Sequence, residues 1–369
     1  MKVLVFCEAD GKNLGDAAIF QGLESLLHGN DLTKMMLGLP IKSSVLHTSG
    51  TTKGRSVFAF LKRYTLFYTT VTLLRLLAVK SLNLKSTIRN IKKNDIVIVG
   101  GGSLLINNNY VFPLSLSLIT LLCKIYKKKY IILGCSTRPI DSSIAKSCIK
   151  YHVSNAAHIY MRDNLSINIL KDYFNIREVS FIPDLALFNS IDIHNRDGNN
   201  IKEGRKVAIN IMGRTTHGAF SKKNNIQKYK SAISETISFL VSKQYSVSLF
   251  TTGEDGDEEL MLELAKATGL NSLHPKSTYA LFDFIDGNDV IVSTRLHAGI
   301  ISIARCKGVV PIIWDSKVKG FFESIQYDGQ SIDLTDIDFS TIYTGIVNAS
   351  PLKLNIDSYR KEIIDVIKK

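Results

Sequence analysis

The sequence predicts an α/β protein with two doubly wound domains, each a parallel sheet covered by helices, facing each other across a cleft. At 369 residues the chain is too long for one ordinary hydrophobic core. Short apolar strands alternate with helices in both halves, which is typical of parallel sheets. A polar, turn-rich stretch at 194–200 separates the halves. We therefore expect domains over 1–193 and 201–350, followed by a terminal helix over 351–369.

Elements of the first half follow from apolar runs and from helical spacing. Short apolar runs bounded by polar or turn residues predict strands at 2–7, 95–99, 130–133, 158–161 and 179–182. Apolar residues at helical spacing predict helices at 15–28, 112–126, 142–153 and 165–173. Each helix connects two strands, so the order indicates a doubly wound sheet.

The second half repeats the alternation after the polar stretch. Its expected strands are 207–211, 247–250, 290–292 and 309–313. Its expected helices are 226–243, 258–267, 279–285, 298–304, 318–325 and 351–369. The carboxyl edges of two such sheets are where we expect ligands to bind.

Positive charge is concentrated in the first half. The formal net charge is +13; residues 1–190 hold 24 Lys/Arg and 11 Asp/Glu, whereas residues 191–369 hold 22 of each. Residues 32–94 contain 12 basic side chains and no acidic one. Within them, apolar and aromatic residues recur at helical spacing over 56–80, beside lysine and arginine. This segment is either a helix on an anionic membrane surface or a core helix with snorkelling lysines.

Composition and motifs argue against several classes of protein. Five scattered cysteines without C-x-x-C spacing exclude a disulfide scaffold and a cysteine zinc site. No nucleic-acid module is recognisable, so nucleic acid is not an expected partner. The longest uncharged run, 103–123, is interrupted by asparagines and a proline, so it is too short to cross a bilayer. The N-terminus resembles a buried strand more than a secretory signal, so the expected location is the cytoplasm.

Seven residues at strand ends of the first half are candidates for binding a sugar acceptor. They follow the first, second, fourth and fifth expected strands, at the edge where ligands bind in doubly wound sheets. The glycines permit close approach of a ligand, although a tight turn is the alternative explanation. The polar members suit sugar hydroxyls, although helix capping and structural ion pairs are alternatives. These residues are Asn13, Asp16, Gly101, Gly102, Ser103, Arg162 and Asp184.

The strongest motif follows a strand of the second half and leads into an apolar helix. It places Arg295 and His297 at the helix start, where backbone N–H groups and the helix dipole favour an anion. Ser293 or Thr294 is the expected cap of this helix. Arg214, at another strand end, would add a second arginine fork for a carboxylate or phosphate. The histidine can exchange a proton near neutral pH, although a lone histidine is more often structural.

A metal site is not expected. The eight histidines show no H-x-x-x-H spacing, and no carboxylate cluster resembles a nucleotide–metal clamp. The acidic run at 255–259 is expected to open the helix at Glu258 instead.

In this order the motifs resemble the polysaccharide pyruvyl transferase family. The resemblance extends from residue 2 to about 325, and Arg295-Leu296-His297-Ala298 is its specific part. Segments 32–94 and 194–230 match no motif. The other matching pieces are Asn13-Leu14-Gly15-Asp16, Gly100-Gly101-Gly102, Arg162-Asp163, Pro183-Asp184 and Pro311.

The resemblance implies a fold and an activity. The fold would be two Rossmann-like domains of the GT-B type. The enzyme would transfer pyruvate from phosphoenolpyruvate, its co-substrate, to two hydroxyls of a sugar and form a cyclic ketal, with no cofactor. Arg295, Leu296 and His297 would bind phosphoenolpyruvate with Arg214 as the second arginine, and Arg295 and His297 would be catalytic.

The basic first half fits an acceptor attached to a membrane lipid, as in the synthesis of capsule or exopolysaccharide. We therefore expect a cytoplasmic protein with a peripheral position on the inner face of the cell membrane. Two other functions stay open: a nucleotide-sugar-dependent GT-B glycosyltransferase of the same pathway, and a non-catalytic, membrane-associated scaffold of polysaccharide assembly. An acidic residue that grips a ribose would favour the glycosyltransferase, and the sequence identifies none convincingly.

Overall fold

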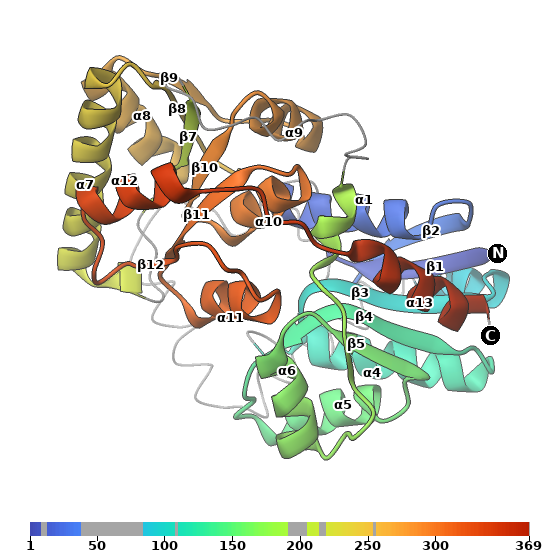
Figure 1. Cartoon of the computed structure of the whole chain (residues 1–369). Coiled ribbons are helices and arrows are strands. Elements are labelled where there is room, and N and C mark those ends of the chain that lie inside the picture. Colours follow the sequence, from blue (N-terminus) through green and yellow to red (C-terminus); the bar gives the residue numbers. More distant parts are fainter. Residues whose placement is uncertain are drawn as a thin grey trace, which may run out of the picture. The chain divides into compact units, whose positions relative to one another are not determined.

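The chain folds into two compact units, each with a six-stranded parallel sheet and flanking helices, as the sequence predicts (Figure 1). The computed structural model describes residues 1–8, 13–37, 84–107, 110–190, 205–213, 219–253 and 256–368. Unit 1 comprises Met1–Glu8 and Gly29–Ile182, and unit 2 comprises Ala9–His28 and Pro183–Lys369. The expected linker at 194–200 lies outside the described residues.

The sheet of unit 1 has the order β2-β1-β3-β4-β5-β6. Its central strands are buried over most of their length, because both faces of a parallel sheet are covered by other elements. The strand order reverses between β1 and β3, which makes this the switch point of the sheet. The strands are β1 (Lys2–Cys7), β2 (Asp31–Met36), β3 (Ile96–Leu105), β4 (Tyr130–Thr137), β5 (His158–Met161) and β6 (Ser180–Phe181).

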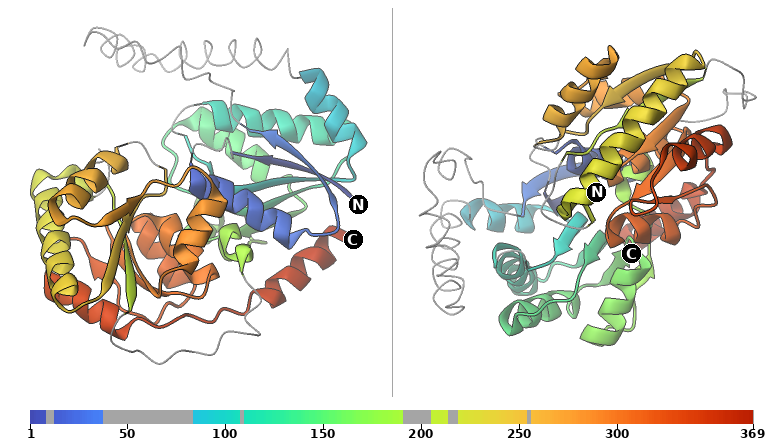
Figure 2. Two further views of the ribbon diagram at one scale, coloured as in Figure 1. Left: turned by 90° about the horizontal axis from the view of Figure 1, so that it is seen from above. Right: turned by 90° about the vertical axis from the view of Figure 1, so that its left-hand side faces the viewer.

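Helices α4 (Val111–Ile125) and α5 (Ser143–Val153) lie side by side on one face of this sheet (Figure 1, Figure 2). Together with the helical residues 84–93, they close a core of aliphatic side chains over the strands. A short helix, α6 (Asn164–Asn168), continues into a π-helical turn at Ile169–Tyr173. Asp163 caps α6 by accepting a hydrogen bond from the N–H of Ser166 at 2.7 Å.

The sheet of unit 2 has the order β12-β11-β10-β7-β8-β9, which is the Rossmann order. Its strands are β7 (Lys206–Asn210), β8 (Ser246–Phe250), β9 (Asn271–Leu273), β10 (Val290–Ser293), β11 (Gly308–Ile313) and β12 (Ile332–Asp333). Its helices include α7 (Lys223–Ser242), α8 (Asp257–Thr268), α9 (Thr278–Asp286), α10 (Leu296–Ala304), α11 (Ser316–Ser324), α12 (Phe339–Asn348) and α13 (Ile356–Lys368).

Helix α1 (Leu14–Leu26) follows β1 in the chain but groups with unit 2. It packs against a 3₁₀ helix at Leu185–Asn189 and against α10. Gly22 makes this approach possible, because a Cβ atom there would overlap the carbonyl oxygen of Leu185. The side-chain amide of Asn189 then donates a hydrogen bond to the carbonyl of Ala18 at 2.7 Å.

Among the described residues, no helix is both long enough and apolar enough to cross a membrane. The amphipathic segment expected at 56–80 lies outside the described residues, so its packing stays a prediction.

Candidate functional site

The candidate site of unit 2 lies where the strand order of its sheet reverses, between β7 and β10. Ligands of doubly wound sheets bind beyond the carboxyl ends of the strands at such a switch point. Asn210 ends β7, and its Oδ1 accepts a hydrogen bond from the backbone N–H of Arg295 at 2.8 Å. This bond ties the loop after β10 to the end of β7.

The side chain of Arg295 is held by a buried carboxylate. Its Nε and Nη2 atoms donate to the two carboxylate oxygens of Asp257 at 2.8 and 2.7 Å. The same carboxylate accepts a bond from the N–H of Gly213 at 2.7 Å. The side chain of Asp257 is 1% exposed and that of Arg295 is 19% exposed. A buried carboxylate needs such a partner, and the paired fork fixes the plane of the guanidinium.

The edge of the Arg295 guanidinium that faces away from Asp257 carries Nη1, and this is the edge at which a ligand can bind. Among the described residues, Arg295 Nη1 donates to none. An arginine that is neutralised along one edge and partly exposed can still offer N–H donors along the other. It therefore acts as an oriented hydrogen-bond donor more than as a free charge.

The start of α10 differs in one detail from the prediction. Arg295 is the N-cap residue, and no side chain caps the helix, so the expected cap by Ser293 or Thr294 is wrong. Ser293 instead donates to the carbonyl of Arg295 at 2.9 Å, and Thr294 pairs with the hydroxyl of Tyr229 at 3.1 Å. The positive end of the helix dipole lies beside Arg295, as expected for an anion site.

The start of α1 lies against the start of α10, within unit 2. A Cβ atom at Gly15 would overlap Nδ1 of His297, so the absence of a side chain at Gly15 gives the imidazole its place. Asn13 caps α1, its Oδ1 accepting a bond from the N–H of Gly15 at 2.8 Å. Asp16 lies in the same first turn. Two motifs that the sequence analysis singled out, Asn13–Asp16 and Arg295–Ala298, therefore meet at His297.

Tyr229, from helix α7, holds the loop after β10 through its hydroxyl group. Its hydroxyl contacts Thr294 at 3.1 Å and accepts a bond from the N–H of Met212 at 3.4 Å. Burial raises the pKa of Tyr229 to about 12, with the hydrogen bond to Thr294 acting in the opposite direction. Trp314 donates from Nε1 to the carbonyl of Thr294 at 2.8 Å. The loop is thus held by two neutral side chains, the buried Tyr229 and the half-buried Trp314.

A second cluster lies at the carboxyl edge of the sheet in unit 1. Arg162 is 3% exposed, and its Nη2 donates to Ser103 Oγ at 3.2 Å and to Ser136 Oγ at 3.1 Å. The two serine hydroxyls are 2.9 Å apart. Gly101 and Gly102 have φ values of 79° and 75°, a region that favours glycine. Their conformation carries the strand into a bulge that aims Ser103 at the arginine.

The structure gives the other predicted residues clear positions. Leu296 is buried in the first turn of α10. Asp184 is 1% exposed and caps the 3₁₀ helix by accepting from the N–H of Ala186 at 3.0 Å, so a contact with acceptor hydroxyls stays a prediction. Arg214 lies outside the described residues. In the described part of the chain, no group of three His, Cys, Asp or Glu side chains could hold a metal ion.

Sequence reasoning missed the residues that hold the site together. Asp257 was expected only as part of an acidic helix start, although it follows β8 and so lies at a strand end. Ser136 is the next-to-last residue of the apolar strand β4 and belongs to no recognisable motif. Tyr229 lies in the middle of α7, where an aromatic residue indicates only core packing.

Solved structures show the same architecture at low sequence identity. The UDP-GlcNAc 2-epimerase from Methanocaldococcus jannaschii, in complex with UDP-GlcNAc and UDP, is 10% identical, with a TM-score of 0.54 over 100% of this chain and 99% of that one. The enzyme from Neisseria meningitidis bound to UDP-GlcNAc is 10% identical, with a TM-score of 0.53 and the same coverage. The chain is therefore a GT-B-like α/β protein with two Rossmann-like domains.

The family follows from the sequence match. The model of the polysaccharide pyruvyl transferase family matches residues 13–316. The chain belongs to the polysaccharide pyruvyl transferase family. The matched range includes every candidate residue of both clusters. No curated protein matches the sequence.

Proposed function

We propose that this protein transfers pyruvate from phosphoenolpyruvate to two hydroxyls of a sugar and forms a cyclic ketal. The acceptor would be a surface-polysaccharide or lipid-linked glycan intermediate. The observation that carries the proposal is the start of α10 at the switch point of unit 2, where an oriented Arg295 and His297 adjoin an uncapped helix N-terminus. A small dianion with a carboxylate and a phosphate suits these donors.

Each residue of this site has a role in the proposal. Arg295 binds the phosphate and stabilises the charge that develops as it departs, while Asp257 fixes the guanidinium plane. Leu296 supplies the adjoining backbone of the first turn. Arg214, which follows β7 in the sequence, would bind the carboxylate as the second arginine.

His297 is the proposed general acid and base. A proton is added to the methylene carbon of phosphoenolpyruvate, and the first sugar hydroxyl attacks the neighbouring carbon. The bond between this carbon and the phosphate ester oxygen then breaks, and phosphate leaves. The second sugar hydroxyl attacks the same carbon and closes the ketal. The two hydroxyl protons end on the new methyl group and on the phosphate, so the reaction balances without a cofactor or metal.

The acceptor side of the proposal rests on two sets of residues. Asn13 and Asp16 belong to the helix start that adjoins His297, so they are the first choice for holding acceptor hydroxyls. The unit 1 cluster of Arg162 and Ser103, with Gly101 and Gly102, is the second choice, and Asp184 is the third. A cytoplasmic enzyme held at the inner face of the membrane through residues 32–94 would meet a lipid-linked acceptor there.

Ligand binding is the first test. Phosphoenolpyruvate at about a hundred times its dissociation constant should stabilise unit 2 by about 2.7 kcal/mol, which a thermal shift detects. The stabilisation should vanish in Arg295→Ala. Stabilisation by a UDP- or GDP-sugar alone would replace the proposal with the glycosyltransferase alternative.

Product formation is the second test. Phosphate release from phosphoenolpyruvate should depend on added acceptor, and mass spectrometry should detect a pyruvate ketal. Arg295→Ala and His297→Ala should abolish both. A cell in which both variants leave the polysaccharide unchanged would favour the scaffold alternative.

A further inference from the structure

Helix α4 of unit 1 presents an apolar stripe on its outer side. Leu121 and Ile125 are 48% and 57% exposed, although most large apolar side chains of this unit are buried. Leu114 and Leu118 precede them on this side at helical spacing, but both are half-buried and pack against the core over the sheet. We name the two exposed residues, Leu121 and Ile125, the α4 stripe.

Lysines surround the last turn of the same helix. Lys124, Lys127 and Lys129 are exposed, and Lys128 is half-buried. Lys128 donates to the carbonyl of Asn94 at 2.6 Å, which holds its charge beside the helix end. Lys124 donates to Asn155 Oδ1 at 3.0 Å, across to the end of α5. We name Lys124 and Lys127–Lys129 the lysine cluster.

No carboxylate belongs to the helices that cover this face of the sheet. Four segments build this side of unit 1: the helical residues 84–93, α4, the turn 126–129 and α5. Together they contain ten lysines and arginines but no aspartate or glutamate. Lys92 lies over the ring of Tyr126, 4.6 Å from its centre, which brings a further cation to the same end of α4. The charged residues of these helices, next to the apolar stripe, are therefore all positive.

We propose that the α4 stripe and the lysine cluster form a docking surface for an anionic lipid bilayer. Exposed leucine and isoleucine beside lysine is the pattern of a helix that lies in the membrane interface. The apolar side chains would enter the acyl boundary, while the lysine ammonium groups reach the headgroup phosphates. The α4 stripe and the lysine cluster both lie among the described residues and outside the segment 32–94. Lys92, which belongs to that segment, adds a cation beside them.

Charge and apolarity together select this partner over others. A nucleic acid would satisfy the lysines but leaves Leu121 and Ile125 without apolar contact. A second copy of the chain, related by a two-fold axis, would place the same surface against itself, which covers Leu121 and Ile125 but offers the lysine cluster no carboxylate from this surface. Only a surface that is both anionic and apolar matches both features.

Vesicle flotation of the full-length protein tests the proposal. Wild-type protein should float with phosphatidylcholine vesicles that contain about one third phosphatidylglycerol, and should stay behind with phosphatidylcholine alone. High salt should weaken the binding. Neutralising an interfacial lysine costs about fivefold in partitioning, so Lys124→Gln/Lys127→Gln/Lys129→Gln should lose about a hundredfold. The variant Leu121→Ser/Ile125→Ser should bind anionic vesicles more weakly than the wild type, and its residual binding should disappear at high salt.

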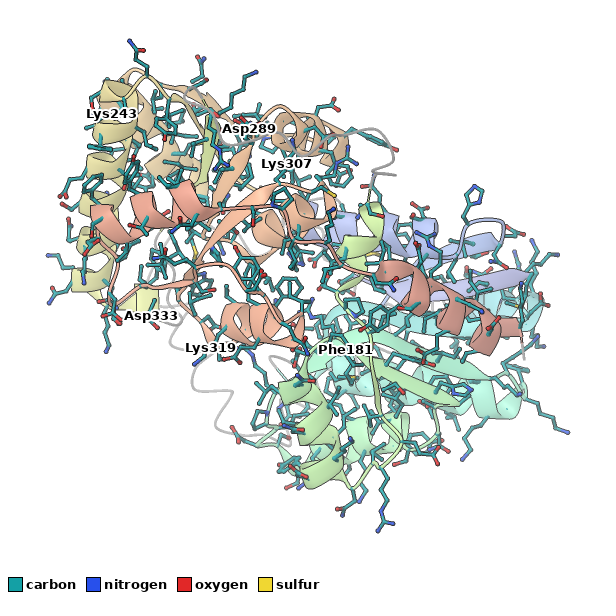
Figure 3. All side chains as sticks on the ribbon, viewed as in Figure 1. Phe181, Lys243, Asp289, Lys307, Lys319 and Asp333 are labelled. Carbon is teal, nitrogen blue, oxygen red and sulfur yellow. The ribbon has the colours of Figure 1, made fainter. Side chains whose placement is uncertain are left out.

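Matched variants of unit 2 provide the control. Lys243→Gln/Lys266→Gln/Lys276→Gln removes the same charge from exposed positions, one of them at the end of α7 (Figure 3). Val241→Ser/Leu262→Ser removes apolar side chains of similar exposure, 47% and 51%. Both controls should float like the wild type.

Several results would overturn the proposal. One is equal loss of flotation in the α4 and control variants, and another is no flotation of the wild type at low salt. If Leu121→Ser/Ile125→Ser lowers the melting temperature with flotation unchanged, the stripe is covered within the protein. If it turns a dimer into a monomer, the partner is a second copy. If the lysine variant loses binding to duplex DNA while the wild type ignores vesicles, the partner is nucleic acid.

Discussion

Arg295 and Asp257 form a pair whose purpose the sequence alone does not reveal. A buried ion pair of this kind either braces two helices or presents a guanidinium to a ligand. The geometry favours presentation, because the carboxylate binds one edge of the guanidinium and leaves the side chain partly exposed. Substitution of the carboxylate separates the two roles.

The variant Asp257→Asn should lose both stability and ligand binding. Removing one partner of a buried pair costs about 3 kcal/mol, measured by urea unfolding. The thermal shift with phosphoenolpyruvate should also vanish, because the guanidinium loses its orientation. Asp286→Asn is the control, since Asp286 pairs with Arg305 at the other end of α10. It should destabilise the protein yet keep the ligand shift; a shift retained in both variants would mean that the Arg295 pair is only a brace.

The variant Gly15→Ala should displace the imidazole of His297. The added methyl overlaps Nδ1, and the histidine is the more movable group. We expect a fall of about tenfold to a hundredfold in kcat with little change in KM for phosphoenolpyruvate, because a misplaced catalytic group affects the reaction more than binding. Gly320→Ala in α11 meets no neighbour and is the control. Equal kinetics in both variants would exclude a role for this contact.

At the scale of elements, the sequence predicted the buried centre of each sheet better than its edges. The strands expected at 95–99, 207–211 and 290–292 correspond to β3, β7 and β10, because continuous apolar runs mark strands buried on both faces. The edge strand β2 was missed, since Asp31–Met36 is half-exposed and contains polar residues. The short edge strands β9 and β12 were missed for the same reason.

The candidate site was predictable in part for a related reason. Strand-end residues such as Arg295 are visible in sequence, because the position rule for doubly wound sheets needs only local order. Their partners are not, because Asp257 and Arg295 are 38 residues apart and meet only in the folded sheet. Gly15 and His297 are separated by most of the chain, and no local pattern links them.

The packing of α4, α5 and β4 makes unit 1 sensitive to acid. His152 is fully buried, its Nδ1 2.8 Å from Thr120 Oγ1 and its ring stacked on Tyr130. Burial lowers the pKa of His152 to about 3. The unfolded chain takes up a proton below about pH 6.5, so this stability is present above that pH and is lost as the pH falls towards 3.

Urea unfolding at two pH values measures this effect. Between pH 7 and pH 5, His152 should account for a loss of about 2 kcal/mol in the free energy of unfolding. His152→Phe should remove most of that loss, whereas His158→Gln, at an exposed position, should keep it. An unchanged pH dependence in His152→Phe would contradict the assignment.

For the whole molecule, the two units should respond differently to phosphoenolpyruvate. Hydrogen exchange should slow by about a hundredfold at the start of α10 and in the first turns of α1 at saturating ligand. The strands of unit 1 should show a smaller effect, and Arg295→Ala should show none. Protection confined to the Arg162 cluster would move the donor site to unit 1.

Helix α1 imposes an order of events on synthesis of the chain. It leaves the ribosome near the beginning, but the elements of unit 2 that it packs against begin at Pro183. Its apolar side must therefore wait, unpaired with its final partners, while all of unit 1 is translated. Unit 2 can be completed only by packing against α1, a helix that was synthesised before all of its partners. A ribosome that stalls after residue 182 therefore leaves a chain with all strands of the first sheet, while α1 still lacks the elements it packs against.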